Sequence, residues 1–254
     1  MRTVEHVTTA NRGSTHDVTR LLVTRQDPTS MYRPLGFLEA HADVDGVEYT
    51  FAYLRRAVAA PGFRPLVGMP QVRRYVSRGL FPLFAERLMD PRRPDRADYL
   101  AALDLGPDAS PLLVLSRSGG HRAGDAVELS PVPSADADGR SSCVFLVHGI
   151  RHMPGSDAAL DSLEEGDELA LMPQPENRHN ARALLVSARD SAPVGWVPDV
   201  LLDYVHGLAQ PVVRVVRVNG PDVGSRLRLL VRVDGGAVAG WAPFSGPDWD
   251  VVDG

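Results

Sequence analysis

The sequence contains no lysine, one cysteine and no long apolar run. All 27 basic residues are arginine, which a GC-rich coding sequence explains more simply than a selected arginine-rich surface. The single Cys143 cannot close an internal disulfide, and no apolar stretch approaches the roughly 20 residues of a membrane-spanning helix. The N-terminus also lacks the apolar segment of a secretory signal. These absences predict a soluble, cytoplasmic protein that makes no membrane contact.

Familiar catalytic and metal-binding patterns are missing as well. No Gly-x-Ser-x-Gly segment marks a nucleophile elbow, and His148 and His152 have no second ligand pair at zinc-like spacing. The Gly-rich segment SGGHRAG, residues 118–124, lacks the Gly-Lys-Ser/Thr ending of a phosphate loop, so we interpret it as a hairpin turn. Cys143 heads an apolar strand, which predicts a buried structural thiol. We therefore expect a non-enzymatic protein without a metal or cofactor.

Charge is unevenly distributed along the 254 residues. Residues 1–140 hold 18 Arg and 17 acidic residues, whereas residues 141–254 hold 9 Arg and 15 acidic residues, which gives net charges of +1 and −6. Residues 55–96 form the one basic segment, with ten Arg and three acidic residues. That segment is either a solvated face or a surface for phosphate or an acidic partner protein.

The chain divides into an arm, two domains and a linker. Residues 1–16 are polar and aperiodic, which predicts a flexible arm, and residues 17–133 form a first domain long enough for its own core. Residues 134–141, rich in Ser and Asp, are the expected linker, and residues 142–254 form the second domain. Short strands dominate both, so we expect an α+β fold with two β-rich domains, the second a small OB-like barrel with helices.

Local patterns predict the individual elements. In the first domain, residues 31–40 and 47–58 read as strands joined by a turn, residues 72–88 as a helix split by Gly79 and Pro82, and residues 111–120 as a buried strand paired with residues 126–131. Residues 96–106 read as a short helix. In the second domain, strands are expected at 143–150, 167–174, 181–188, 192–198, 211–219 and 226–233, and helices at 157–166 and 199–208.

The second domain resembles the HIRAN domain. The matching motifs are VHGI, EGDELALMPQ, PENRHNARA and VGWVPDVLLDYV, in the family's order and spacing over about 75 residues. The resemblance implies an OB-like β-barrel with helices and a pocket that grips the 3′ end of single-stranded DNA. The polar box PENRHNARA would then be a loop on the rim of the barrel.

The resemblance also implies site residues. Arg151 stands where a family arginine contacts phosphate, and His152 stands where an aromatic ring stacks on a base. Asn177 is the first Asn of the box, His179 takes an aromatic position, and Asn180 replaces an Asp that accepts a hydrogen bond from a terminal sugar hydroxyl. A neutral amide accepts such a bond more weakly than a carboxylate does, and His is a smaller stacking platform than Tyr. These departures should weaken recognition of a 3′ hydroxyl.

The first domain resembles the N-terminal subdomain of HipA-type toxin kinases. The resemblance covers about 110 residues through PLGFLEA, YTFAYLRRA, FRPLVGMP and GLFPLFAERLMDPRR. In that family this subdomain packs on the kinase core, near the surface that contacts the antitoxin. The chain has no Gly-rich ATP loop, strand Lys or catalytic Asp loop, so we expect it to phosphorylate nothing by itself.

Two hypotheses follow from the sequence. The first is a non-catalytic adaptor that binds single-stranded DNA or DNA ends through Arg151, His152, Asn177, His179 and Asn180. The second is a protein-interaction or regulatory module of a toxin-antitoxin or defence system, which restrains or recruits a separate kinase, helicase or nuclease. The charge of −6 on the second half favours the second hypothesis, because phosphate neutralisation dominates nucleic-acid affinity.

Overall fold

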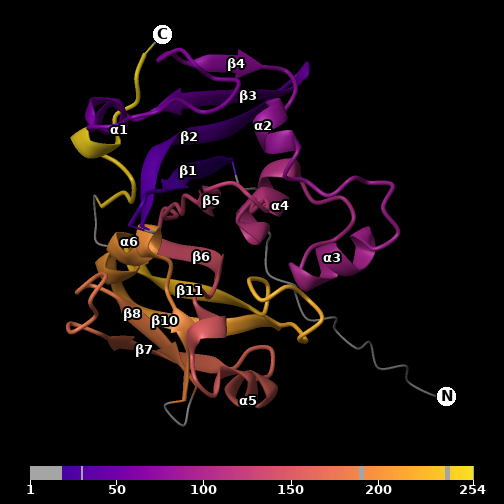
Figure 1. Cartoon of the computed structure of the whole chain (residues 1–254), viewed down its shortest axis with the longest axis vertical. Helices are drawn as coiled ribbons and strands as arrows, with labels where there is room; N and C mark the ends of the chain where they lie inside the picture. The colour runs from indigo at the N-terminus through magenta and orange to yellow at the C-terminus, as the bar shows by residue number, and fades with distance from the viewer. Residues whose placement is uncertain (1–18, 30, 189–191, 238–240, 254) are drawn as a thin grey trace, which may run out of the picture.

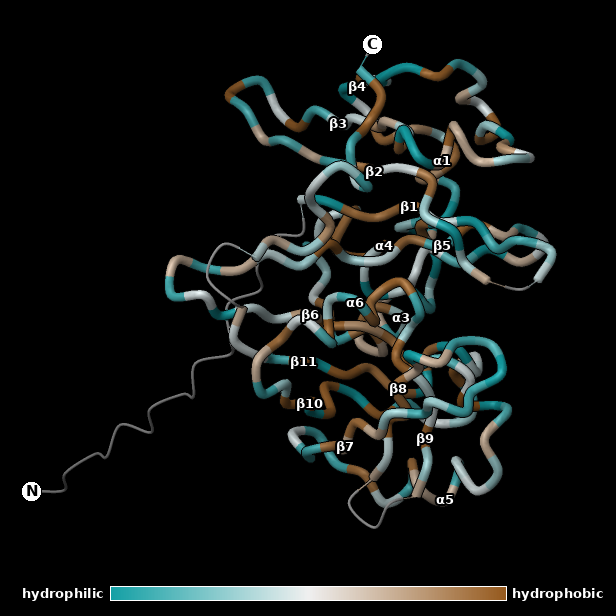
Figure 2. Tube along the Cα trace, turned by 90° about the vertical axis from the view of Figure 1, so that its left-hand side faces the viewer, coloured by the Kyte–Doolittle hydropathy of each residue, from teal (hydrophilic) through white to brown (hydrophobic). Residues whose placement is uncertain are grey.

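The computed structural model describes residues 19–29, 31–188, 192–237 and 241–253. The arm expected over residues 1–16 lies outside the described residues. Two antiparallel sheets lie one above the other, and short helices surround them, so the fold is a mixed α+β fold (Figure 1). Hydrophobic residues recur along the strands of both sheets (Figure 2), and the buried ones form one contiguous core with members from both sheets.

The first sheet has five strands in the order β4-β3-β2-β1-β5. Its members are β1 (Arg20–Gln26), β2 (Tyr32–Asp43), β3 (Gly46–Tyr53), β4 (Tyr75–Ser77) and β5 (Val127–Pro131). The expected β2–β3 pair is confirmed, with Gly36 opposite Tyr53 in the register. A Cβ at Gly36 would lie 2.3 Å from the Ala52 carbonyl oxygen, so only glycine allows these two strands to approach so closely.

The second sheet has six strands in the order β6-β11-β10-β7-β8-β9. Its members are β6 (Arg140–Leu146), β7 (Glu168–Pro173), β8 (Leu184–Ser187), β9 (Pro193–Trp196), β10 (Leu208–Val218) and β11 (Leu229–Ala237). The sheet curls into a half-barrel until β9 meets the residues that follow β6. There the His148 and Trp196 backbones exchange two hydrogen bonds of 2.9 and 2.8 Å.

The helices are short and lie at the edges and between the sheets. They are α1 (Arg55–Ala59), α2 (Pro82–Ala85), α3 (Arg96–Ala102), α4 (Pro111–Ser118), α5 (Ser156–Asp161) and α6 (Leu202–Gly207), with 3₁₀ turns η1 (Ile150–His152), η2 (Asp199–Leu201) and η3 (Pro247–Trp249). No helix in the described ranges is long and apolar enough to cross a membrane.

The expectation of a strand at residues 111–120 is wrong, because this segment is the helix α4. The Ser110 side chain caps the helix by accepting a hydrogen bond of 3.3 Å from the Leu113 backbone N–H. Pro111 occupies the first turn, and Gly119 ends the helix with a φ of 69°. The helix is buried on all sides between the sheets, so its sequence shows a continuous apolar run rather than a stripe.

Two further expectations for the first half are wrong. Residues 118–124 are not a hairpin turn, since they connect α4 to β5, and β5 pairs with β1. Residues 72–88 are not helical throughout. Tyr75–Ser77 forms the edge strand β4, in which Tyr75 packs on Phe51 while Val76 is 56% exposed, so the apolar pattern there has the period of a strand.

The C-terminal segment Trp241–Asp253 crosses back to the first sheet. Trp241 stacks on Tyr204 of α6 with 5.9 Å between ring centroids, and Trp249 lies 6.0 Å from Phe37 of β2. The Val252 N–H donates to the Tyr53 carbonyl oxygen over 2.8 Å, extending the hydrogen bonding at the end of β3. Within the expected linker, residues 134–141, the Asp136 N–H donates to the Arg140 carbonyl oxygen over 2.8 Å, and β6 begins at Arg140.

The prediction of a buried thiol is confirmed. Cys143 is 4% exposed, and burial raises the pKa of its thiol to about 12. Because the thiolate is the reactive form, we expect iodoacetamide at pH 8 to leave Cys143 unmodified in the folded protein and to label it fully in denaturant. Intact-mass spectrometry measures both states, and rapid labelling of the folded protein would contradict the buried environment.

Candidate functional site

A cleft of about 190 Å³ opens between the two sheets. We call it the inter-sheet cleft. Its lining comes from β1, β2, the α4–β5 connection and β5 on one side, and from β6, η1, η2 and the β10–β11 loop on the other. Polar and charged side chains on this lining include Tyr32, His121, Glu128, His148, Arg151, His152 and Arg226.

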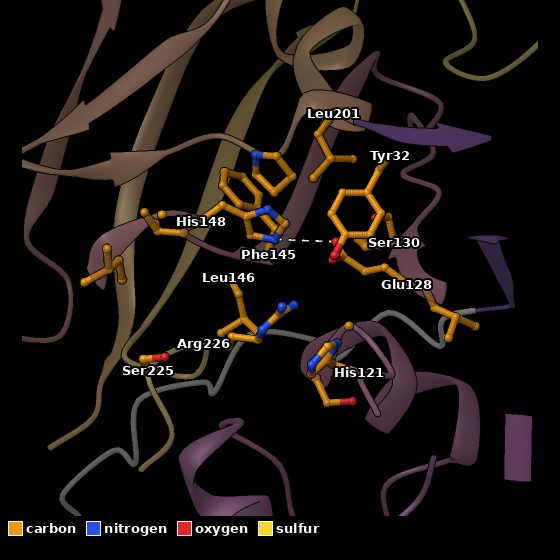
Figure 3. Close-up of a pocket in the computed structure, with 18 of the residues that line it drawn as sticks. Tyr32, His121, Glu128, Ser130, Phe145, Leu146, His148, Leu201, Ser225 and Arg226 are labelled. Atoms are coloured by element: carbon orange, nitrogen blue, oxygen red, sulfur yellow. Dashed lines mark ion pairs between the residues drawn. The ribbon is translucent and has the colours of Figure 1, made fainter. Parts of the chain in front are cut away.

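A buried carboxylate forms the floor of the inter-sheet cleft. Glu128 of β5 is 6% exposed, and its Oε1 lies 3.5 Å from Nε2 of His148 (Figure 3). Tyr32 of β2 projects toward the same carboxylate, and burial, followed by the Glu128 charge, raises the pKa of the Tyr32 hydroxyl. The hydroxyl is therefore neutral at physiological pH. Two side chains from different sheets thus hold one carboxylate.

Cationic and imidazole side chains lie at the mouth of the inter-sheet cleft. Arg226 of the β10–β11 loop and His121 of the α4–β5 connection face each other in Figure 3, and both are exposed. Desolvation, followed by the nearby Arg226 charge, lowers the pKa of His121. The His121 ring is therefore mostly neutral near pH 7 when no anion is present.

Arg151 and His152 stand together at the same cleft. The Arg151 Nε–H donates to Nε2 of His152 over 2.9 Å, which fixes the two exposed side chains side by side. Arg151 also lines a second hollow of about 300 Å³, together with Ser225 and the Arg228–Asp157 ion pair. Arg151 therefore borders both the inter-sheet cleft and the second hollow.

The other three residues predicted from the sequence lie on the β7–β8 loop and do not line the inter-sheet cleft. The Asn177 Oδ1 accepts hydrogen bonds from the backbone N–H groups of His179 and Asn180, over 2.9 and 3.2 Å. Asn180 donates through Nδ2 to Asp199 over 3.1 Å and accepts from the Arg182 N–H over 3.0 Å. Both Asn side chains hold the loop itself, and the His179 side chain is exposed.

One segment connects the β7–β8 loop with the inter-sheet cleft. In the segment that follows β9, the Trp196 backbone forms hydrogen bonds with the His148 backbone, and the Asp199 side chain accepts one from the Asn180 side chain. Pro198 lies between Trp196 and Asp199 in the sequence and lines the inter-sheet cleft. The β7–β8 loop and the residues that precede η1 therefore contact the same segment, residues 196–199.

Sequence reasoning missed Tyr32, His121, Glu128 and Arg226, and treated His148 only as a possible metal ligand. Glu128 carried the clearest signal, because it is an acidic residue inside the apolar strand Val127–Pro131, all of which is buried. A buried carboxylate needs a partner, and the partner of Glu128 is His148, which follows a strand of the other sheet. Within the described residues, no group of three His, Cys, Asp or Glu side chains is arranged to hold a metal ion.

The basic segment 55–96 does not line the inter-sheet cleft. Most of its arginines make contacts within the molecule: Arg55 with Asp253, Arg56 with the Trp249 ring, Arg74 with Glu39, Arg78 with Asp43, Arg87 with Asp125, Arg92 with Asp90, and Arg93 with Asp95. These contacts favour the interpretation of this segment as a solvated face.

No protein-family model and no curated protein matches the sequence. Among solved structures, the HIRAN domain of human HLTF aligns with a TM-score of 0.29 and 20% identity, over 42% of this chain and 79% of that one. A protein from Lactobacillus plantarum aligns with a TM-score of 0.31 and 16% identity, over 38% of this chain and 97% of that one. Likenesses at these scores carry no argument, so the resemblance to the HIRAN domain rests on the sequence motifs.

Proposed function

We propose that the protein is a non-catalytic adaptor that binds single-stranded DNA, or the exposed end of a strand, where the half-barrel meets the inter-sheet cleft. The observation that supports this most directly is the exposed pair Arg151 and His152 at the cleft. A guanidinium neutralises phosphate, and an imidazole held beside it offers a flat face to a base. Asn177 and Asn180 would keep the β7–β8 loop in place, and His179 would offer a second face.

The acidic charge of the second half is compatible with this proposal. Salt screens exposed charges beyond about 8 Å at physiological ionic strength, so distant carboxylates have little effect at the cleft. Arg151 and Arg226 act at contact distance, and among the described residues neither forms an ion pair with a carboxylate. The local charge at the mouth therefore favours an anionic ligand.

Replacing Arg151 by alanine should weaken the binding of a short single strand about tenfold, because one phosphate contact is lost. Fluorescence anisotropy over a salt series measures the affinity, and the slope of log affinity against log salt should fall by about 1. Arg92→Ala is the matched control, since the Arg92 side chain is 90% exposed and pairs with Asp90 away from the cleft. Absence of any binding at low salt would remove the proposed function.

A further inference from the structure

The mouth of the inter-sheet cleft is built from three separate connections. Arg226 comes from the β10–β11 loop, His121 from the α4–β5 connection and Arg151 from η1. Most described arginines pair with a carboxylate, whereas the described contacts of Arg151 and Arg226 include no such pair. Arg226 forms a side-chain hydrogen bond with the Tyr32 hydroxyl, and His121 lies beside it (Figure 3). Two guanidinium groups without a carboxylate ion pair among the described residues and an imidazole around one opening form an anion-binding arrangement.

The size of the cleft limits the group that can enter. Its volume of about 190 Å³ is below the roughly 300–1,000 Å³ of pockets that enclose drug-sized molecules. The cleft therefore suits a small end group of a strand rather than a complete base with its sugar.

The buried Glu128 pairs with His148 and forms no ion pair with a guanidinium among the described residues, although its charge opposes the lowering of the His121 pKa. Its carboxylate points toward Tyr32 and His148 in Figure 3, away from the space between Arg226 and His121. Both neighbours can donate a hydrogen bond to it. Glu128 therefore positions Tyr32 and His148 in the wall of the cleft, and the cationic side chains lie at its opening.

We propose that the mouth of the inter-sheet cleft binds a terminal phosphate monoester of a single strand, with Arg226 and Arg151 as its cations and His121 as an additional donor. The inference rests on the proposed function and specifies which end that site prefers. A terminal phosphate has a charge of about −1.5 to −2 at neutral pH and three terminal oxygens, whereas a phosphodiester inside a strand has one charge. Two guanidinium groups at one opening favour the group with more charge and more acceptors.

The second hollow indicates the path of the rest of the strand. It shares Ile150, Arg151 and Ser225 with the inter-sheet cleft. A strand whose last phosphate lies beside Arg226 would therefore pass over Arg151 before it reaches this hollow. Arg151 would contact both the terminal phosphate and the first internal one.

The test compares three labelled oligonucleotides of one sequence, with a 3′-phosphate, a 5′-phosphate or hydroxyl groups at both ends. We expect one of the phosphorylated strands to bind at least about tenfold more tightly than the hydroxyl strand, and the identity of that strand gives the polarity. Arg226→Gln should abolish this preference, because the phosphorylated strand loses more affinity than the hydroxyl strand does. Arg92→Gln removes the same charge from an exposed position and should leave the preference intact. A free nucleoside monophosphate as competitor distinguishes a strand end from a small nucleotide.

Equal binding of all three strands would overturn the inference and leave the proposed function standing. If no strand binds, the proposed function fails, and inorganic phosphate then tests the cleft directly. Phosphate should shift the NMR signals of the His121 and His148 rings in the native protein and not in Arg226→Gln. Unshifted imidazole signals would reject the anion site on their own.

Discussion

Replacing Arg87 by alanine should destabilise the protein by about 3 kcal/mol, because it removes one partner of a buried ion pair. The Arg87 side chain is fully buried and forms an ion pair with Asp125. It also donates to the carbonyl oxygens of Gly120 over 2.8 Å and Leu83 over 3.1 Å. The substitution would leave two carbonyl oxygens and a carboxylate without this donor. We place the loss at the lower end of the usual range because Asp125 is 31% exposed.

Urea denaturation of Arg87→Ala measures this loss, and Arg122→Ala is its control. Arg122 lies on the α4–β5 connection, between the Arg87 partners Gly120 and Asp125. It pairs with Glu86, but both side chains are more than half exposed. Exposed pairs contribute about 0–1 kcal/mol, so this variant should remain close to the native protein. Equal losses in the two variants would mean that burial does not determine the strength of the Arg87 pair. Since Gly120 precedes His121, Arg87→Ala should also weaken anion binding at the cleft.

Gly195→Ala should cost about 2–3 kcal/mol, the upper part of the range for overpacking a well-packed interior. A Cβ at this position would lie 2.5 Å from the His148 carbonyl oxygen and 2.6 Å from Cγ1 of Val147. The first of these atoms belongs to the backbone and cannot rotate away. Strand β9 would have to move off the residues that follow β6, which breaks the two hydrogen bonds between His148 and Trp196.

Thermal or urea denaturation tests Gly195→Ala against Gly220→Ala. A Cβ at Gly220 would meet no atom within 4 Å, so this control should change stability by less than about 0.5 kcal/mol. The displaced β9 should also move His148 away from Glu128, so DNA binding should fall in Gly195→Ala even under conditions where it stays folded. Native-like stability of Gly195→Ala would show that β9 can shift without opening the half-barrel.

The motif around Gly195 shows how much of the second half could be predicted from the sequence. The pattern VGWVP predicted a strand followed by a helix, and the structure has β9 and then η2 and α6. Short apolar runs were sufficient to predict β6, β10 and β11 as strands. The β7–β8 loop was also predicted as a loop. Its Asn side chains proved to bond within the loop and to Asp199.

The first half was harder to predict because burial removed the usual signals. Helix α4 is buried on every side and begins with the apolar run Leu112–Leu115, so it shows no stripe, and only Ser110, Pro111 and Gly119 mark its ends. The inter-sheet cleft could not be predicted at all from local patterns. Glu128 and His148 meet only because two sheets pack together, and no spacing in the sequence encodes that contact. The similarity of the first half to HipA-type kinases stays a prediction from sequence motifs.

Because the C-terminal segment returns to the first sheet, residues that are synthesised at very different times pack together in the folded protein. Leu54 at the end of β3 pairs with Val251, which is translated about 200 residues later, or roughly 10–40 s later at 5–20 residues per second. Until then the nascent chain presents the Phe37 surface without Trp249. The first sheet therefore keeps an apolar surface around Phe37 open to chaperones until Trp249 has been synthesised.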